Sequence, residues 1–120
     1  MTFGEIFLER MIQMMMINLT PHTVNIVRED GSILSIAPSG KVARCEQREE
    51  QMPVLADGIP VMRLVMGAVV DLPPAQEGVI YLVSHIVMQA CPERKDLAKP
   101  GQLVRNEAGE IIGCRCLNVL

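Results

Sequence analysis

Aromatic side chains are almost missing from this sequence. Among its 120 residues there is no tryptophan, one tyrosine (Tyr81) and two phenylalanines (Phe3 and Phe7), and the formal net charge is −3. Proteins that bind long nucleic acids need positive charge for the phosphates, and many stack aromatic rings on unpaired bases. Because this chain has little of either, we do not expect a long nucleic acid as its partner.

Long hydrophobic runs are missing as well. The apolar run at residues 14–19 is far shorter than the roughly 20 residues that a membrane-spanning helix needs. Glu5 and Glu9 stand where an export signal would have positive charge. We therefore expect no membrane span and no export signal, and a cytoplasmic location.

Metal-binding and disulfide patterns are also weak. The four cysteines (Cys45, Cys91, Cys114 and Cys116) have no C-x-x-C spacing, and without an export signal we expect them to be reduced. Cysteine is among the most buried residue types, so we expect these side chains in the core. Cys114-x-Cys116 together with only two histidines is too small a ligand set to predict zinc. We predict no metal and no cofactor.

Aliphatic residues and nine methionines are plentiful and must fill the core. From Ile17 onward they occur in short runs separated by turn residues, which is typical of β-strands. The sequence therefore predicts a mainly β (α+β) fold, either a compact antiparallel sheet or a partly open barrel.

Several local features are specific enough to predict single elements. Asp30-Gly31 predicts a hairpin that returns through a strand at 33–36, and residues 79–83 read as a strand buried on both faces. Ser84 is a favourable N-cap and Pro92 a helix breaker, so residues 85–90 are predicted to form the one short internal helix. Residues 102–105 and 111–117 are predicted to pair as a final hairpin. We expect Gly67 to mark a bulge or turn, and residues 48–50 to form a solvated rim.

The first fifteen residues stand apart from the rest. Between Phe3 and Met11 the apolar residues have helical spacing. Residues 1–15 are either an N-terminal helix docked on the domain or a neighbouring subunit, or sequence upstream of a natural start at Met14, Met15 or Met16. We expect residues 16–120 to form a single β-rich domain.

A set of short motifs spans most of residues 16–117. They are Asn18-Leu19-Thr20-Pro21-His22, Pro38-Ser39-Gly40, Val42-Ala43-Arg44, Gly58-Ile59-Pro60-Val61, Leu72-Pro73, Tyr81-Leu82-Val83-Ser84, Pro92, Arg94, Asp96-Leu97, Pro100-Gly101, Val104-Arg105 and Gly113-Cys114. In these motifs the chain resembles an uncharacterised family of small bacterial and phage proteins that open with Asn-Leu-Thr-Pro-His. Asn106 departs from the acidic residue expected after the Val-Arg pair. The resemblance implies no activity, but the family's presence in phages implies a role between virus and host.

Arginines on loops and strand ends are the candidate ligand-binding residues. Guanidinium groups give bidentate contacts to phosphate or carboxylate, so Arg44, Arg94 and Arg105 are predicted to converge on a small anionic ligand. His22 and Ser84, the latter at a helix N-terminus with free backbone amides, are predicted to help. Asp96 is included because it lies beside Arg94. The alternative is that Arg94 and Asp96 form only a loop ion pair, which would contribute about 0 to 1 kcal/mol if exposed.

These residues favour a non-enzymatic binding protein for a small anionic ligand such as a nucleotide. If the protein is phage-encoded, it would sequester a signalling nucleotide. We also expect a homo-oligomer, because a small aliphatic domain leaves apolar surface to cover.

Two alternative functions remain open. One is a protein–protein interaction module that engages a host or phage protein through a strand edge or apolar surface. The other is a small hydrolase or isomerase that uses His22 as its acid or base. We assign no catalytic residue, because no Gly-x-Ser-x-Gly motif or Cys–His pair supports one, and an enzyme is the less favoured class.

Overall fold

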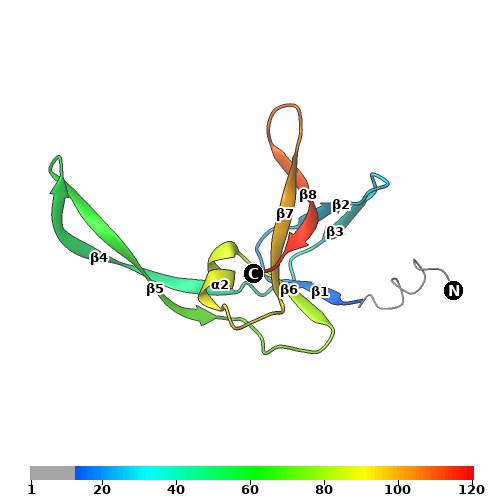
Figure 1. The fold of residues 1–120 in the computed structure, drawn as a ribbon, viewed down its shortest axis with the longest axis horizontal. Coiled ribbons are helices and arrows are strands. Elements are labelled where there is room, and N and C mark those ends of the chain that lie inside the picture. Colours follow the sequence, from blue (N-terminus) through cyan, green and yellow to red (C-terminus); the bar gives the residue numbers. More distant parts are fainter. Residues whose placement is uncertain (1–12) are drawn as a thin grey trace.

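A six-stranded sheet with a long hairpin projecting from it makes up most of the protein (Figure 1). The structure is a computed structural model and describes residues 13–120. The elements in chain order are β1 (Met15–Asn18), β2 (Val24–Val27), β3 (Ile33–Ile36), β4 (Arg44–Ala56), β5 (Ile59–Val70), β6 (Val79–Leu82), α2 (His85–Ala90), β7 (Leu97–Arg105) and β8 (Ile111–Asn118). Of the predicted N-terminal segment, residues 1–12 lie outside the described range, whereas Met15 is already part of β1.

The six-stranded sheet is nearly closed into a barrel. Its strand order is β1-β6-β7-β8-β2-β3, and the two end strands, β1 and β3, approach each other. The prediction of a mainly β fold with a partly open barrel is therefore confirmed. The sheet is mixed rather than antiparallel, because β1–β6, β6–β7 and β2–β8 pair in parallel. The sequence pattern locates strands, but a parallel pairing such as β6–β7 depends on the crossover through α2.

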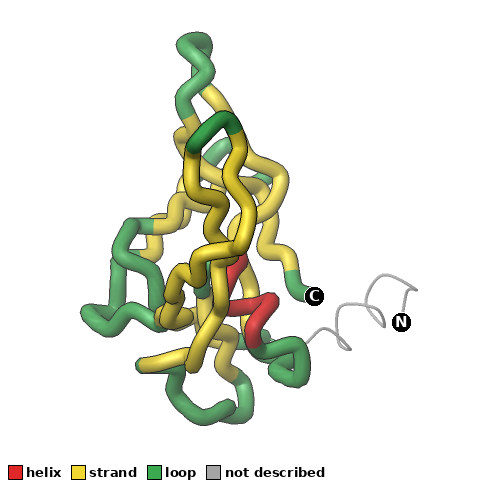
Figure 2. The backbone as a smooth tube through the Cα atoms, turned by 90° about the vertical axis from the view of Figure 1, so that its left-hand side faces the viewer, coloured by secondary structure: helices red, strands yellow, loops and turns green. Residues whose placement is uncertain are grey.

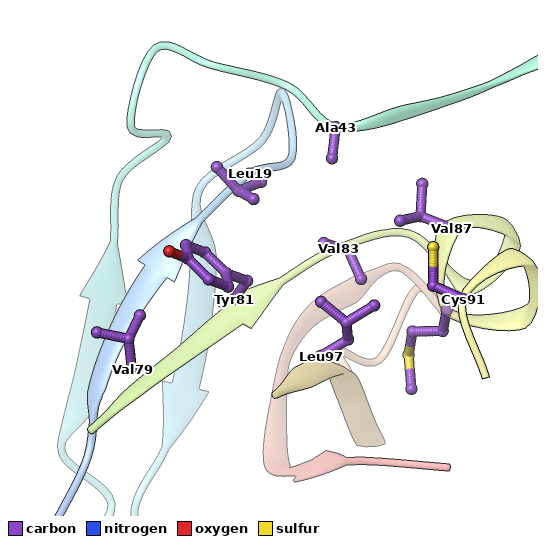
Figure 3. Packing of buried hydrophobic residues seen from close by; sticks show 9 residues of the cluster. Leu19, Ala43, Val79, Tyr81, Val83, Val87, Cys91 and Leu97 are labelled. Atoms are coloured by element: carbon purple, nitrogen blue, oxygen red, sulfur yellow. The ribbon is translucent and has the colours of Figure 1, made fainter. Parts of the chain in front are cut away.

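Strand β6 is buried on both faces, as predicted. On one face Val79, Tyr81 and Val83 pack with residues of α2 and with Leu19 and Leu97 (Figure 3). On the other face Leu82 packs inside the barrel, in a second cluster with Val24, Ala98 and Cys114. The alternation of side chains along a strand thus lets β6 join the two parts of the core.

Helix α2 has the bounds that the sequence predicts. The Ser84 hydroxyl oxygen accepts a hydrogen bond from the Val87 amide (3.3 Å), and the helix ends at Ala90, with Cys91 as its C-cap just before Pro92. Val87 and Met88 are buried against the core, while His85 and Ile86 face outward. Figure 2 shows this helix as the single short helical segment among the described strands and loops. No helix within residues 13–120 is long and apolar enough to cross a membrane.

Both predicted short hairpins are present. Strands β2 and β3 pair antiparallel across Asp30-Gly31, where the Arg28 amide donates to the Ser32 carbonyl (2.8 Å). Strands β7 and β8 pair antiparallel, and the Asn106 amide donates to the Glu110 carbonyl (2.9 Å) at their turn.

Strands β4 and β5 form a hairpin much longer than the sequence indicates (Figure 1). Asp57 and Gly58 both have positive φ (51° and 76°), as the type I′ turn of a two-residue hairpin requires. Gly67 and Ala68 lie opposite the single residue Glu46, so Gly67 marks a bulge as predicted. The predicted rim at residues 48–50 lies within β4. The sequence does not show this strand because both of its faces are solvated, so apolar and polar residues do not alternate along it in the usual way.

Asn18 holds the two ends of the barrel together. Its side chain is buried, with 1% exposed. Its amide nitrogen donates to the carbonyls of Ile36 (2.9 Å), at the end of β3, and His22 (2.8 Å). Its amide oxygen accepts from the Thr20 backbone amide (2.9 Å) and the Thr20 hydroxyl (2.7 Å). Together with the Ser39 amide, which donates to the Asn18 carbonyl (2.9 Å), this side chain links β1 to the end of β3 and fixes the turn that follows β1.

Replacing Asn18 with alanine should lower the free energy of unfolding by about 2 to 4 kcal/mol, because two backbone carbonyls and a backbone amide lose their partner in a buried site. Urea denaturation of the wild type and Asn18→Ala measures this. Asn25→Ala is the matched control, since the Asn25 amide oxygen accepts from the exposed Ser35 hydroxyl; its loss should be about 1 kcal/mol or less. Equal losses in the two variants would contradict the role assigned to Asn18.

Candidate functional site

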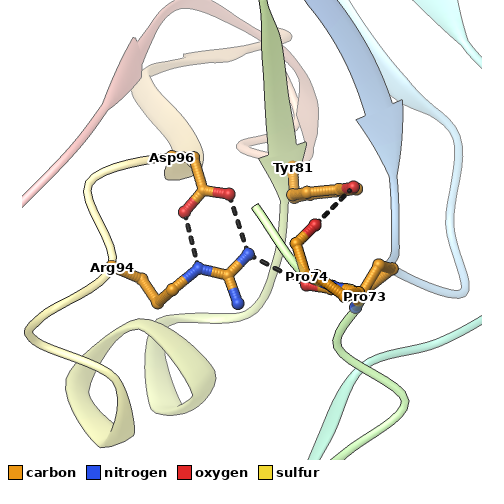
Figure 4. Close-up of polar contacts among 5 residues, drawn as sticks. All are labelled: Pro73, Pro74, Tyr81, Arg94 and Asp96. Atoms are coloured by element: carbon orange, nitrogen blue, oxygen red, sulfur yellow. Dashed lines mark hydrogen bonds and ion pairs between the residues drawn. The ribbon is translucent and has the colours of Figure 1, made fainter. Parts of the chain in front are cut away.

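Arg94 and Asp96 form a bidentate ion pair. The Arg94 Nε donates to Asp96 Oδ1 (2.8 Å), and Arg94 Nη2 donates to Asp96 Oδ2 (2.7 Å) (Figure 4). The same Nη2 also donates to the Pro73 carbonyl (3.0 Å). The two side chains are only 19% and 13% exposed, so this is not the loosely held surface pair of the alternative prediction.

This ion pair fastens two loops to β6. The Tyr81 hydroxyl donates to the Pro74 carbonyl (3.2 Å), and the Tyr81 amide donates to the Asp96 carbonyl (2.8 Å). The guanidinium holds the pKa of the Asp96 carboxyl below its usual range through hydrogen bonding, and Asp96 raises the pKa of Arg94 for the same reason. These hydrogen bonds stabilise the fold, and those of the ion pair use Arg94 Nε and Nη2.

A cavity lies at the N-terminal end of α2, whereas Arg94 and Asp96 follow its C-terminal end. It is a groove of about 590 Å³. The turn after β1, the start of β2 and the β7–β8 hairpin all contribute to its lining. The loop between β6 and α2 completes it. We call it the histidine groove, after His22 and His85, the two histidines of the chain, which both line it.

Lysine, histidine and uncharged side chains line the histidine groove, and among residues 13–120 no carboxylate does. Lys99 on β7 is half-buried, whereas His22, His85 and Ser84 are exposed. Apolar residues make up much of the remaining surface: Pro21, Val24, Val83, Pro100, Leu103, Ile111 and Ile112. Because the whole chain has more acidic than basic residues, 14 against 11, this lining differs from the average surface.

Close packing of β2 and β8 shapes the wall of the groove. The two strands share a single parallel bridge, Ile26 with Cys114, and the Cys114 thiol donates to the Asn25 carbonyl (3.5 Å). A Cβ atom at Gly113 would lie 2.9 Å from the Asn25 carbonyl oxygen. Gly113 therefore lets β2 and β8 approach each other, and any larger residue at this position would push the two strands apart.

The six predicted binding residues lie in four places, and only His22 and Ser84 meet in the histidine groove. His22 and Ser84 line the histidine groove. Arg44 lines a smaller groove of about 330 Å³, which shares Thr20, Pro21 and Ser84 with the first. Arg94 and Asp96 form the ion pair near Pro73, and Arg105 donates to the Gly109 carbonyl (2.8 Å) at the β7–β8 turn. The three arginines thus occupy three different places.

Lys99 is the residue that sequence reasoning missed. It lies in the pattern Lys99-Pro100-Gly101, which reads as an ordinary turn in sequence, and it becomes part of a strand only through pairing with β6 and β8. His85, in the first turn of the predicted helix, was expected to face solvent or form a pocket wall rather than act as a base, and no ligand-binding role was assigned to it. The available signal was its position directly after a capping serine at the end of a buried strand, where ligand sites often form in α/β units.

The four thiols are free, and two of them are buried. Burial raises the pKa of Cys91 and of Cys114, which keeps both thiols protonated and poorly nucleophilic. Within residues 13–120 no three His, Cys, Asp or Glu side chains are grouped closely enough to hold a metal ion.

Replacing Arg94 with alanine should lower the free energy of unfolding by about 2 to 4 kcal/mol, because it leaves the Asp96 carboxylate largely buried without its partner. Thermal or urea unfolding measures the loss. Arg48→Ala is the control, since its ion pair with Glu50 is exposed and such pairs contribute about 0 to 1 kcal/mol. An Arg94→Ala protein as stable as the wild type would contradict the structural role.

The ion pair also predicts a pH dependence. A carboxyl whose pKa is lowered by folding stabilises the protein at pH values above its unfolded pKa, about 3.9 for Asp. That stabilisation is lost as the pH falls through the lowered folded value. The stability difference between the wild type and Asp96→Asn should therefore be full near pH 7 and shrink below about pH 4. A difference that stays constant from neutral to strongly acidic pH would show that Asp96 is not the group responsible.

Comparisons with known proteins found no match: no protein-family model, no curated protein and no solved structure is similar enough to this chain to assign it to a family. The resemblance to small bacterial and phage proteins thus stays a prediction. Any functional conclusion has to come from the histidine groove and the surfaces around it.

Proposed function

We propose that this protein binds a small anionic ligand, such as a nucleotide, in the histidine groove and does not transform it. The observation that supports the proposal is the lining: Lys99, His22 and His85 face one groove in a chain of net charge −3, and no carboxylate of the described residues 13–120 lines it. An anion entering this groove would meet hydrogen-bond donors and positive charge without a repelling neighbour.

Each polar residue of the groove has a distinct part in this proposal. The Lys99 ammonium group supplies the positive charge, and its half-buried position strengthens the attraction because less water screens it. The Ser84 hydroxyl oxygen accepts from the Val87 amide, which leaves its O–H free to donate to a ligand. His22 and His85 reach the same space from the turn after β1 and from the first residue of α2.

The size and apolar walls of the groove favour a ligand with a nonpolar or ring-containing part. A volume of about 590 Å³ lies within the range of small-molecule sites, which is roughly 300 to 1,000 Å³. Leu103, Ile111 and Ile112 offer exposed aliphatic surface against which a nucleobase can pack. The charged end of such a ligand would then lie toward Lys99. Arg44, in the neighbouring groove that shares Ser84, could contact a longer ligand.

Binding is favoured over catalysis because the groove lacks a complete acid–base arrangement. A histidine base is normally oriented by a carboxylate or similar partner, and within the described residues no Asp or Glu lines the groove. We further propose a cytoplasmic location, in keeping with the free thiols, and, if the protein is phage-encoded, sequestration of a signalling nucleotide.

The decisive variant is Lys99→Ala, which should weaken binding about 10- to 100-fold, the effect of losing one charged hydrogen bond. Isothermal titration with nucleoside mono-, di- and triphosphates, and with inorganic phosphate, measures it once one of these probes binds the wild type. Native mass spectrometry of protein purified from cells shows in addition whether a phosphorylated compound comes with it.

Lys41→Ala is the matched control, since it removes the same side chain from an exposed site outside both grooves. It should bind like the wild type. Equal affinities for Lys99→Ala and wild type, or no binding of any probe and no compound released, would reject the proposal.

A further inference from the structure

The β4–β5 hairpin leaves an apolar row uncovered. Met62, Leu64 and Met66 alternate along β5 and share one face, and they are 43%, 56% and 43% exposed. On the same face β4 places Gln47, Glu49 and Gln51 directly opposite them. The ribbon extends away from the barrel in Figure 1, and neither strand has a third neighbour in the described part of the chain.

The two free edges of this ribbon differ in charge. The thirteen residues of β4 include Arg44, Glu46, Arg48, Glu49 and Glu50, together with Pro53. Charges and proline are the devices that keep an edge strand from pairing with another chain. The twelve residues of β5 contain one charge, Arg63, and one proline, Pro60, which lies beside the turn. The β4 edge is thus the better protected of the two, and the part of the β5 edge between Pro60 and the bulge at Gly67 is open to pairing.

We propose that β5 pairs antiparallel with β5 of a second copy of this chain, across a two-fold axis at Leu64. The result is a four-stranded sheet in the order β4-β5-β5-β4. This interface is separate from the histidine groove, none of whose lining residues belongs to the hairpin.

The sequence around Leu64 fits this symmetry. In an antiparallel pair centred on Leu64, each Leu64 faces its copy and each Met62 faces a Met66, because the exposed row reads Met-x-Leu-x-Met in both directions. Each Arg63 then faces a Val65 rather than another Arg63, so no like charges are opposed. The bulge at Gly67-Ala68 limits regular pairing to the segment before it.

A second copy is favoured over an unrelated partner because the row complements itself. Self-pairing joins three apolar side chains from each copy into one patch and satisfies backbone groups on the open edge. It also adds strands to a two-stranded ribbon, which is only marginally stable in water on its own.

Leu64→Lys tests the interface directly. It would place two ammonium groups opposite each other at the axis, so a protein that is dimeric at tens of micromolar should become monomeric by analytical ultracentrifugation. Leu64 is exposed, so the fold should survive, which circular dichroism and thermal unfolding would verify. Glu49→Lys is the control: Glu49 lies on the same face, one strand away from the open edge, and the variant should remain dimeric. Its dissociation would point instead to two ribbons stacked face to face.

Cysteine substitution tests the register. Facing residues of an antiparallel pair have Cβ atoms about 4.5 to 5.5 Å apart, so Leu64→Cys should give a disulfide-linked dimer under mild oxidation. Met62→Cys should not, because its copy would lie four residues away along the strand, roughly 13 Å. The wild type under the same oxidation controls for the native thiols.

Several results would overturn the proposal, in addition to dissociation of the Glu49→Lys variant. They are a monomeric wild type at tens of micromolar, a dimer that withstands Leu64→Lys, a failure of Leu64→Cys to cross-link, and cross-linking of Met62→Cys to the same extent. Recovery of a different protein bound stoichiometrically to β5 in place of a second copy would also reject it.

Discussion

The fold depends on one buried amide. Asn18 is the last residue of β1, and its side chain reaches the end of β3, the strand at the other edge of the sheet. A barrel closed by regular strand pairing needs no such bridge, but β1 and β3 are not paired here. The amide offers two donors and an acceptor in one plane, which lets a single residue satisfy backbone groups from two separate segments where water has no access.

The same amide positions the proposed site. By binding the Thr20 amide and the His22 carbonyl, Asn18 fixes the turn from which Pro21 and His22 face the histidine groove. The Asn-Leu-Thr-Pro-His motif thus combines a buried structural residue with an exposed histidine four residues later. The Arg94–Asp96 ion pair fixes the loops beyond the other end of α2. Between these two anchors, the loop from β6 into α2 presents Ser84 and His85 at a set position.

The long hairpin follows different physics from the barrel. In the barrel, strands are specified by burial, and β6 is apolar throughout because both its faces are covered. In β4 and β5, regular structure persists where nearly every side chain is at least partly exposed. The turn at Asp57-Gly58 and cross-strand pairing supply the order there. The exposed apolar row on this ribbon is the surface that the proposed pairing of two copies would use.

Local chemistry alone determined much of this protein. Composition and turn residues predicted a mainly β chain, and a capping serine with a following proline predicted α2, because each of these signals acts within a few residues. The parallel pairings, the length of the β4–β5 hairpin and the separation of Arg44, Arg94 and Arg105 were decided only by tertiary structure. Each of these features depends on which distant segments of the chain meet. Lys99 lies beside the histidines of the groove because of its place in β7. Arg94 contacts Asp96 and the Pro73 carbonyl because two loops pack on β6. The order of residues along the chain indicates residue type and local geometry. A binding site, in contrast, is formed by contacts between residues that are far apart in sequence.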